Sequence, residues 1–295
     1  MKRTIFTGAA TALITPFKDG YVDFSAYGAI IEEQISSGID ALVVCGTTGE
    51  SSTLNDDEHR EVIEFAVSKV AGRVPVIAGT GSNDTEYAVS LSRHACEEGV
   101  DAVLLVTPYY NKATQKGLIK SFSHIADACT KPVILYNVPS RTGIGFKPET
   151  YAALADHGNI AAIKEANGDI SSIAQTAALC GDRLDIYSGN DDQIVPLMSL
   201  GAKGVISVLS NLLPAETHRI CAEFFAGNIA ESRRLQLYYL DLINALFCEV
   251  NPIPAKTAMH LMGKCDIEMR LPLCEMEDKN LERLKTAMRA HGLIS

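Results

Sequence analysis

The sequence lacks any apolar stretch of the roughly eighteen residues that a helix needs to span a bilayer. Its first 17 residues resemble a signal peptide, but threonines interrupt the apolar part and a convincing small-residue cleavage site is missing. We therefore interpret residues 4–17 as containing the first strand, and we expect a soluble, cytoplasmic protein.

Positive charge is also scarce. The 295 residues include 26 Lys and Arg against 36 Asp and Glu, which gives a formal net charge of -10. No basic cluster stands out against this acidic background. This charge balance argues against nucleic acid as a partner.

Paired metal-binding or disulfide motifs are missing as well. The eight cysteines are scattered without a C-x-x-C pair, and the seven histidines show no metal-ligand spacing. We expect free thiols in a reducing cytosol and no metal site.

Two enzyme fingerprints are absent. There is no G-x-S-x-G sequence, so a hydrolase with a serine nucleophile is unsupported. An open doubly wound sheet would need a glycine-rich phosphate loop, but the segment at 79–84 lacks the final glycine.

What the chain does have is a repeated pattern of short apolar runs separated by helix-like segments. Near-continuous apolarity is typical of strands that are buried on both faces. Eight such strand-helix units predict an α/β fold, a (β/α)8 barrel. The runs are residues 9–14, 41–44, 74–78, 102–106, 133–136, 160–163, 185–187 and 204–208.

Beyond about residue 222 the strand pattern stops, and residues 233–247 and 277–290 have helical spacing. We predict a catalytic barrel at 1–224 and a small C-terminal helical domain at 225–295. No flexible linker separates the two, so we expect them to pack rigidly.

Helix starts can be predicted from capping signals. Asn55 with Glu58, and Asn83 with Glu86, have the spacing of an N-cap and an acid three residues later. Pro148 and Pro214 suit first helical positions.

Lys164 closes the apolar run at 160–163 and is followed by Glu165. In a parallel barrel the strand ends form the catalytic mouth, where desolvation favours a neutral, nucleophilic amine. Schiff-base chemistry is the leading hypothesis. The alternative is a solvated lysine that pairs with Glu165.

Other strand ends also carry polar groups. Thr47 and Thr48 lie in a glycine-flanked segment that could hold a carboxylate, or that could form a simple capped turn. Tyrosines at strand ends can relay protons, and Arg141 suits bidentate capture of a carboxylate. Asp191 and Asp192 follow Gly189 and are expected only to start a helix.

In this order the strand-end motifs closely resemble the dihydrodipicolinate synthase family, within the pyruvate-dependent class I aldolases, nearly from end to end. The matching segments are 46–51, 79–81, 107–111, 136–139, Lys164, 204–207 and 251–254. Thr47, Thr48 and the segment 140–143 resemble the synthases, whereas sialic acid lyases typically lack the arginine at 141.

The resemblance implies a role for each matching residue. Lys164 would form an imine with pyruvate, Tyr136 would shuttle protons, and Thr48 would link Tyr136 to Tyr110 of a neighbouring subunit. Arg141 would steady the entrance and the carboxylate of aspartate semialdehyde. The pyruvate pocket would be lined by Thr47, Thr48, Gly189 and Ile206.

The implied reaction is that of a 4-hydroxy-tetrahydrodipicolinate synthase in lysine and diaminopimelate biosynthesis, with no cofactor beyond the covalent imine. The implied assembly is a homotetramer of two tight dimers. Two alternatives remain. A sugar-acid lyase of the same superfamily is discriminated by Arg141 and by the aldehyde consumed. A non-catalytic barrel that binds a keto acid would be expected to lose Lys164 or Tyr136.

A second site in lysine-inhibited synthases is matched only in part. Ser51, His59, Asn83 and Tyr109 match it, whereas Asp56 and Tyr87 stand where a histidine and a glutamate are usual. We predict weak or absent feedback by lysine. Alternatively, Asp56 only caps a helix and Tyr87 only packs at an interface.

Overall fold

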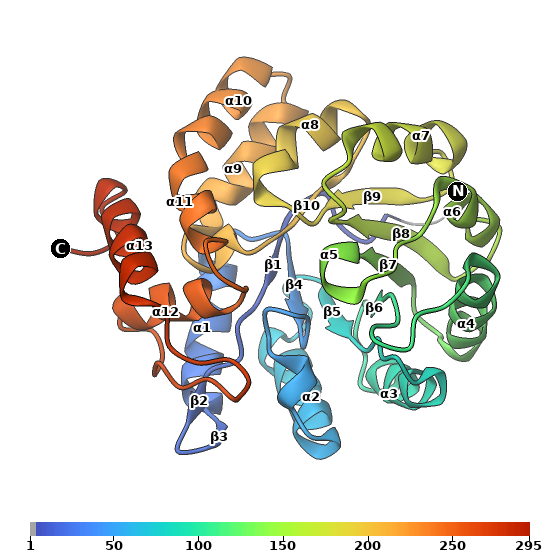
Figure 1. The fold of residues 1–295 in the computed structure, drawn as a ribbon, viewed down its shortest axis with the longest axis horizontal. Coiled ribbons are helices and arrows are strands. Elements are labelled where there is room, and N and C mark those ends of the chain that lie inside the picture. The colour runs from blue at the N-terminus through green and yellow to red at the C-terminus, as the bar shows by residue number, and fades with distance from the viewer. Residues whose placement is uncertain (1–3) are drawn as a thin grey trace.

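A computed structural model describes residues 4–295, and its centre is a closed barrel of eight parallel strands (Figure 1). Strand β1 pairs with both β4 and β10, which closes the ring. This confirms the predicted (β/α)8 barrel. The barrel strands are β1 (Gly8–Ala12), β4 (Ala41–Val44), β5 (Val76–Gly79), β6 (Ala102–Val106), β7 (Val133–Asn137), β8 (Ile160–Glu165), β9 (Asp185–Ser188) and β10 (Gly204–Ser207).

Helices surround the barrel, and a two-stranded ribbon of β2 (Phe17–Lys18) and β3 (Tyr21–Val22) precedes the first of them. Short 3-10 turns follow three of the strands: η1 (Ser51–Thr53), η2 (Asp191–Gln193) and η3 (Leu209–Asn211). The helices up to the barrel's last strand and just after it are α1 (Phe24–Ser36), α2 (Asp56–Val70), α3 (Thr85–Glu97), α4 (Gln115–Ala128), α5 (Pro139–Thr142), α6 (Pro148–Leu154), α7 (Ile170–Cys180), α8 (Ile194–Ser199) and α9 (Pro214–Phe225).

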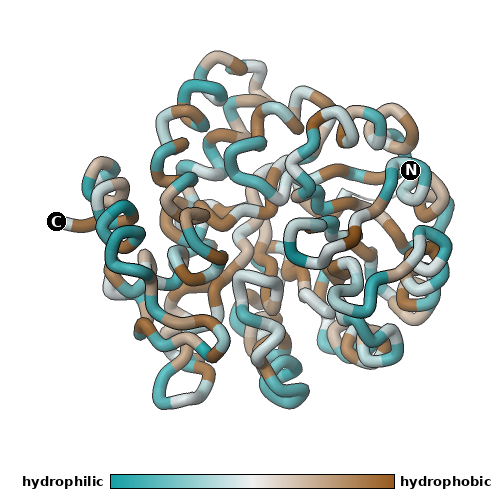
Figure 2. The backbone as a smooth tube through the Cα atoms, in the orientation of Figure 1, coloured by the Kyte–Doolittle hydropathy of each residue, from teal (hydrophilic) through white to brown (hydrophobic). Residues whose placement is uncertain are grey.

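Apolar side chains fill two separate layers, one inside the barrel and one between the barrel and the helices. Successive residues of a strand point to opposite faces. Ile134, Tyr136 and Ala162 belong to the inner cluster, whereas Leu135 and Ile163 belong to the outer one. The strands appear as largely hydrophobic segments in Figure 2.

Most of the predicted helix starts are confirmed. Asn55 and Glu58 form a reciprocal capping box on α2, and Pro148 and Pro214 occupy the first turns of α6 and α9. The prediction at Asn83 is wrong. Asp84 caps α3, because its carboxylate accepts from the backbone N–H groups of residues 86 and 87.

The C-terminal segment is helical as predicted, but it is divided differently. The segment predicted at 233–247 forms α10 (Ile229–Tyr238) and α11 (Leu240–Leu246), and α12 (Ile253–Leu261) follows before α13 (Asp278–Ala290). The predicted boundary at 224/225 falls at the end of α9, and the division into two domains stays a prediction. None of the helices within 4–295 is long and apolar enough to cross a bilayer. Met1 to Arg3, part of the stretch that resembles a signal peptide, lie outside the described residues.

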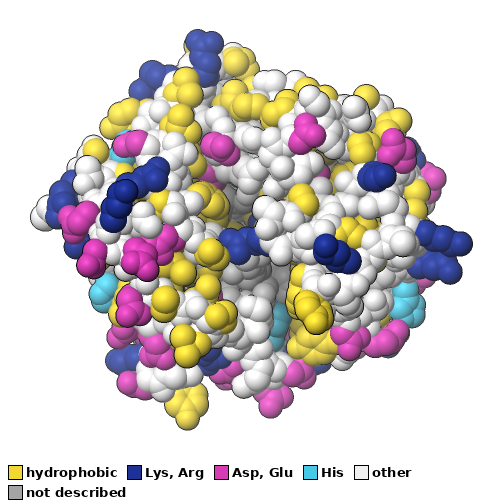
Figure 3. All heavy atoms as spheres, in the orientation of Figure 1, with side chains coloured by type: hydrophobic (Ala, Val, Ile, Leu, Met, Phe, Trp, Pro, Cys, Tyr) yellow, Lys and Arg dark blue, Asp and Glu magenta, His cyan; other side chains and the backbone are white. Residues whose placement is uncertain are grey.

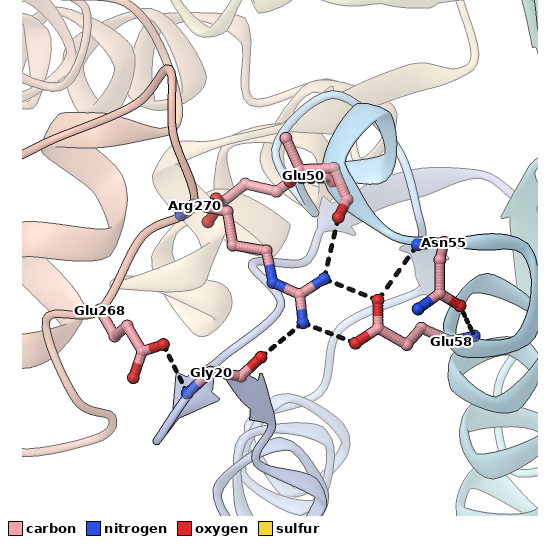
Figure 4. A network of polar contacts seen from close by, with 7 residues as sticks. Gly20, Glu50, Asn55, Glu58, Glu268 and Arg270 are labelled. Atoms are coloured by element: carbon pink, nitrogen blue, oxygen red, sulfur yellow. Dashed lines mark hydrogen bonds and ion pairs between the residues drawn. The ribbon is translucent and has the colours of Figure 1, made fainter.

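Ion pairs join this C-terminal segment to the loop after β4. Lys256 Nζ lies 2.6 Å from Glu50 Oε1, and both side chains are completely buried. Arg270 donates two hydrogen bonds of 2.6 Å to the Glu58 carboxylate and one of 2.8 Å to the Gly20 carbonyl (Figure 4). The backbone N–H of Arg270 also donates to Glu50 Oε2.

Replacing Lys256 with alanine should strongly destabilise the protein, because it leaves the Glu50 carboxylate buried without a counter-charge. Loss of one partner of a buried pair typically costs about 3–5 kcal/mol. Lys285→Ala is the matched control, since the Lys285–Glu282 pair lies on the surface and should contribute less than about 1 kcal/mol. Urea unfolding of both variants measures the difference. Equal losses would contradict the importance of the buried pair.

Candidate active site

Lys164 occupies the fifth position of β8 and lies on the inner face of the barrel. It shares this face with Ala162, two residues earlier, and pairs in register with Tyr136 of β7. Its side chain is only 6% exposed, and Nζ lies 4.3 Å from the centre of the Tyr136 ring. Two residues of the predicted site are therefore brought together at the mouth.

Glu165 points to the opposite face, so the alternative pairing of Lys164 with Glu165 does not occur. The buried Glu165 carboxylate accepts from Asn137 Nδ2 at 2.9 Å and from the Tyr151 hydroxyl at 2.9 Å. Burial raises the pKa of Glu165 to about 7, against the opposing effect of these donors. Through the rest of the described chain, 4–295, no carboxylate forms an ion pair with Lys164. The Lys164 amine is thus buried beside the Tyr136 ring without an ion-pair partner among the described residues.

The loop after β4 is a strained segment that packs closely against β5, rather than a simple capped turn. Cys45 and Glu50 both have positive φ, and a side chain on Gly79 would meet the Cys45 carbonyl oxygen at 2.2 Å. Glycine at 79 therefore allows this loop to lie tightly against β5. Thr48, which is 3% exposed, accepts a hydrogen bond of 2.9 Å from Asn251 Nδ2.

Arg141 lies on the short helix α5, which follows β7. Its guanidinium Nη2 donates to the main-chain oxygen of Asn251 at 2.8 Å. Asn251 thus contacts two predicted site residues, but it was absent from the predicted site. The segment 251–254 did belong to the family-like motifs, and that was the signal available in the sequence.

A cavity of about 380 Å³ opens beside these residues. It brings Thr47 and Arg141 together with four residues of the predicted lysine site: Ser51, His59, Tyr87 and Tyr109. A smaller hollow of about 30 Å³ shares Thr47 and Ser51 with it and reaches Tyr136. In Figure 3 the face seen in Figure 1 is hollowed near its centre, with positively charged side chains close by.

The two residues that depart from the lysine-site pattern contact each other. Tyr87 and Asp56 share a side-chain hydrogen bond, and Arg60 Nε lies 3.0 Å from the Asp56 carboxylate. Burial, and then this bond, raise the pKa of Tyr87 to about 12. Asp56 does not cap α2, because Asn55 does. Asn83 donates to the main-chain oxygen of Tyr109.

Tyr110 is not buried in its own chain. It is 93% exposed and has a φ of 68°, a conformation that bulky residues rarely adopt. Within residues 4–295, no hydrogen bond joins Thr48 to Tyr110 or to Tyr136. The predicted relay is therefore not assembled by one chain.

Gly189 lies next to Lys164. A side chain on Gly189 would meet Ala166 Cβ at 2.8 Å and Lys164 Cε at 3.2 Å, so only glycine leaves room here. Ile206 is fully buried in the inner cluster with Tyr136.

Asp191 has a second role that the sequence analysis missed. It does begin η2, as predicted, but its buried carboxylate accepts from the backbone N–H groups of Val208 and Leu209, both at 3.0 Å. Burial raises the pKa of the Asp191 carboxyl, while hydrogen bonds from Ser207 and the backbone and, least of all, the charge of Lys164 act to lower it. Asp191 therefore ties the loop after β9, which carries Gly189, to the end of β10, which carries Ile206.

One group of metal-ligand side chains does occur, on the outer helices α2 and α3. Potential ligand atoms of Glu64, His94 and Glu98 all lie within 4.8 Å of one another. The His94 Nε2 to Glu64 Oε1 distance is 3.3 Å. These residues do not line the mouth, and the expectation that the protein has no metal site remains a prediction.

Comparison with known proteins identifies the family. Residues 5–291 match the model of the dihydrodipicolinate synthetase family. A 4-hydroxy-tetrahydrodipicolinate synthase from Clostridium perfringens is 56% identical over 290 residues, which are 98% of this chain and 100% of the relative.

Solved structures agree with this result. A dihydrodipicolinate synthase from Aquifex aeolicus superimposes with a TM-score of 0.96 and 45% identity, covering 98% of this chain and 99% of that one. A chloride-inhibited dihydrodipicolinate synthase from Acinetobacter baumannii, complexed with pyruvate, has a TM-score of 0.96 and 42% identity over 99% and 100% of the two chains. The chain belongs to the dihydrodipicolinate synthetase family.

Proposed function

We propose that the protein condenses pyruvate with L-aspartate 4-semialdehyde to 4-hydroxy-tetrahydrodipicolinate, through an imine between pyruvate and Lys164. The reaction is a step of lysine and diaminopimelate biosynthesis. The observation that carries the proposal is the buried Lys164 amine, which faces the Tyr136 ring at the barrel mouth of a chain of this family.

The first step forms the imine. The neutral Lys164 amine attacks C2 of pyruvate, and loss of water leaves an iminium ion. Lys164 is buried and its Nζ lies 4.3 Å from the centre of the Tyr136 ring, so the nucleophile is held at the mouth and shielded from bulk water. Gly189 leaves space for the bound carbon skeleton beside Lys164 Cε.

The second step forms the carbon–carbon bond. The iminium acts as an electron sink, so a base removes a C3 proton and produces an enamine. The enamine C3 then attacks the aldehyde carbon of the semialdehyde, whose oxygen takes up a proton. We assign the movement of these protons to Tyr136, whose ring centre lies 4.3 Å from Lys164 Nζ, and we assign the next place in the relay to Thr48.

The relay is completed in an assembly. We propose that Tyr110 reaches the mouth of a neighbouring subunit in a homotetramer of two tight dimers. The support is its position: an aromatic side chain that is 93% exposed on a strained backbone is suited to insertion into a partner.

The third step releases the product without any cofactor. The amino group of the former semialdehyde attacks the iminium carbon, the Lys164 amine leaves, and the ring closes. Arg141 is suited to hold the carboxylate of this substrate, since this residue lines the cavity of about 380 Å³ together with Thr47. Ile206 forms part of the apolar floor.

We also propose a cytoplasmic location and the division into a barrel at 1–224 and a helical domain at 225–295. Five of the eight free cysteines are buried, which suits a compartment that keeps thiols reduced. In the helical segment α13 packs against α11 and α12, whereas α10 packs mainly against α9, and ion pairs attach the segment to Glu50 and Glu58.

Borohydride reduction in the presence of pyruvate should attach a pyruvate-derived group to the Lys164 peptide and abolish synthase activity. Lys164→Arg keeps the charge but cannot form the imine, so it should show neither the adduct nor turnover. Lys147→Arg is the matched control on an exposed position. Mass spectrometry of the digested protein locates the adduct, and an unmodified Lys164 peptide in the wild type would exclude the mechanism.

Lysine should inhibit the enzyme weakly or not at all. The Asp56 carboxylate is already engaged by Arg60 and Tyr87, which leaves fewer free partners for a ligand ammonium group. We expect activity to change less than about fivefold at sub-millimolar lysine, below the range of typical allosteric coupling.

The matched variant restores the usual pattern by combining Asp56→His with Tyr87→Glu, and it should gain inhibition. Initial rates at increasing lysine concentration test both proteins. Strong inhibition of the unmodified enzyme would contradict the prediction.

A further inference from the structure

Asn251 lies at the crossing point of three segments that are far apart in the sequence. It precedes α12, its side chain amide reaches Thr48 in the loop after β4, and its main-chain oxygen receives the Arg141 guanidinium from α5. It is only 6% exposed. One residue of the C-terminal segment therefore contacts two residues of the proposed machinery.

We propose that Asn251 is a positioning residue of the condensation: its side chain fixes the direction of the hydrogen bond at Thr48, so that the Thr48 hydroxyl donates toward the proton relay. This inference rests on the proposed function, in which Thr48 passes protons between Tyr136 and Tyr110.

The argument starts from hydrogen-bond polarity. An amide nitrogen can only donate, whereas a threonine hydroxyl has one proton and two lone pairs. Asn251 Nδ2 lies 2.9 Å from Thr48 Oγ1, so the threonine oxygen accepts this bond. The proton of the Thr48 hydroxyl is then free to donate to another group.

The direction of this hydrogen bond has consequences because the Thr48 hydroxyl is buried. Thr48 is 3% exposed, so bulk water cannot easily replace the amide or reorient the hydroxyl. A carboxylate in place of the amide would only accept. It would draw the hydroxyl proton toward residue 251 and away from the relay.

A second observation concerns the other polar atom of the Asn251 side chain. Its Oδ1 atom is buried and has no hydrogen-bond partner among residues 4–295. Buried polar atoms normally find partners, and exceptions gather at functional sites. The bond to Thr48 is the one that orients this amide.

The two contacts of Asn251 can be separated by experiment. Arg141 binds the main-chain oxygen, which remains when the side chain is changed. A side-chain variant should therefore keep the carboxylate-binding arginine in place and lose only the hydrogen-bond direction at Thr48. This predicts a fall in kcat with little change in KM.

The experiment compares Asn251→Asp, Thr48→Val and the double variant in the full-length enzyme. Relay groups typically contribute about 10²-fold or more to a proton-transfer step, so each single variant should lose roughly that factor in kcat. The double variant should be no slower than Thr48→Val alone, because both changes remove the same interaction. Both KM values should stay within about threefold, as expected when only a transition-state interaction is lost.

Two further proteins serve as controls. Asn244→Asp introduces the same change at an exposed position of α11 and should keep full activity. Asn251→Ala removes the donor without adding a charge, and it is used if Asn251→Asp fails to fold. It should also lower kcat without raising KM.

Borohydride trapping with pyruvate separates this inference from the proposed function. Asn251→Asp should still form the Lys164 adduct, because the imine step does not need Thr48 to be oriented. Absence of the adduct in the wild type would refute the proposed function itself. With the adduct present, unchanged kcat in Asn251→Asp, or losses that multiply in the double variant, would overturn the role of Asn251.

Discussion

The arrangement of the active site depends on the buried ion pair between Glu50 and Lys256. Glu50 ends the glycine-flanked loop that carries Thr47 and Thr48, and Lys256 lies in the first turn of α12. Lys256 Nζ also lies 4.0 Å from the centre of the Phe17 ring, at the start of the β2–β3 ribbon. Two buried charges are stable only together, so the loop and the C-terminal segment must take up one fixed geometry.

This constraint makes the C-terminal segment part of the active site. Asn251 lies five residues before Lys256 and contacts Thr48, so the ion pair and the amide hold the same loop from two sides. The Arg270 contacts with Glu58 and Gly20 extend the attachment to α2 and to the ribbon. The C-terminal segment thus supplies the counter-charge for Glu50 and the hydrogen-bond donor for Thr48, both in a loop at the barrel mouth.

Much of the fold could be predicted from the periodicity of apolar residues, whereas contacts between residues far apart in the sequence could not. Eight apolar runs predicted the barrel, and strand alternation places Lys164 inside and Glu165 outside. The sequence could not predict that Asn251 would meet Thr48, because 203 residues separate them. The prediction that Asn83 caps α3 was wrong, because Asn83 and Asp84 are adjacent and both residue types suit an N-cap. Asp191 was read locally as a helix start, whereas its carboxylate reaches backbone groups 17 and 18 residues away.

The alternation along β8 also limits how such a site can change during evolution. Lys164 and Glu165 are neighbours in the chain but face different environments, one beside the Tyr136 ring, the other lined by hydroxyl, amide and backbone donors. A one-residue deletion within this strand would exchange the two faces, placing a carboxylate in the mouth and an amine among donors. The surroundings of Lys164 do not suit a carboxylate, and those of Glu165 do not suit an amine. The nucleophile therefore cannot shift along β8 by single-residue insertions or deletions. A lineage can lose this lysine or keep it, but it cannot move it gradually.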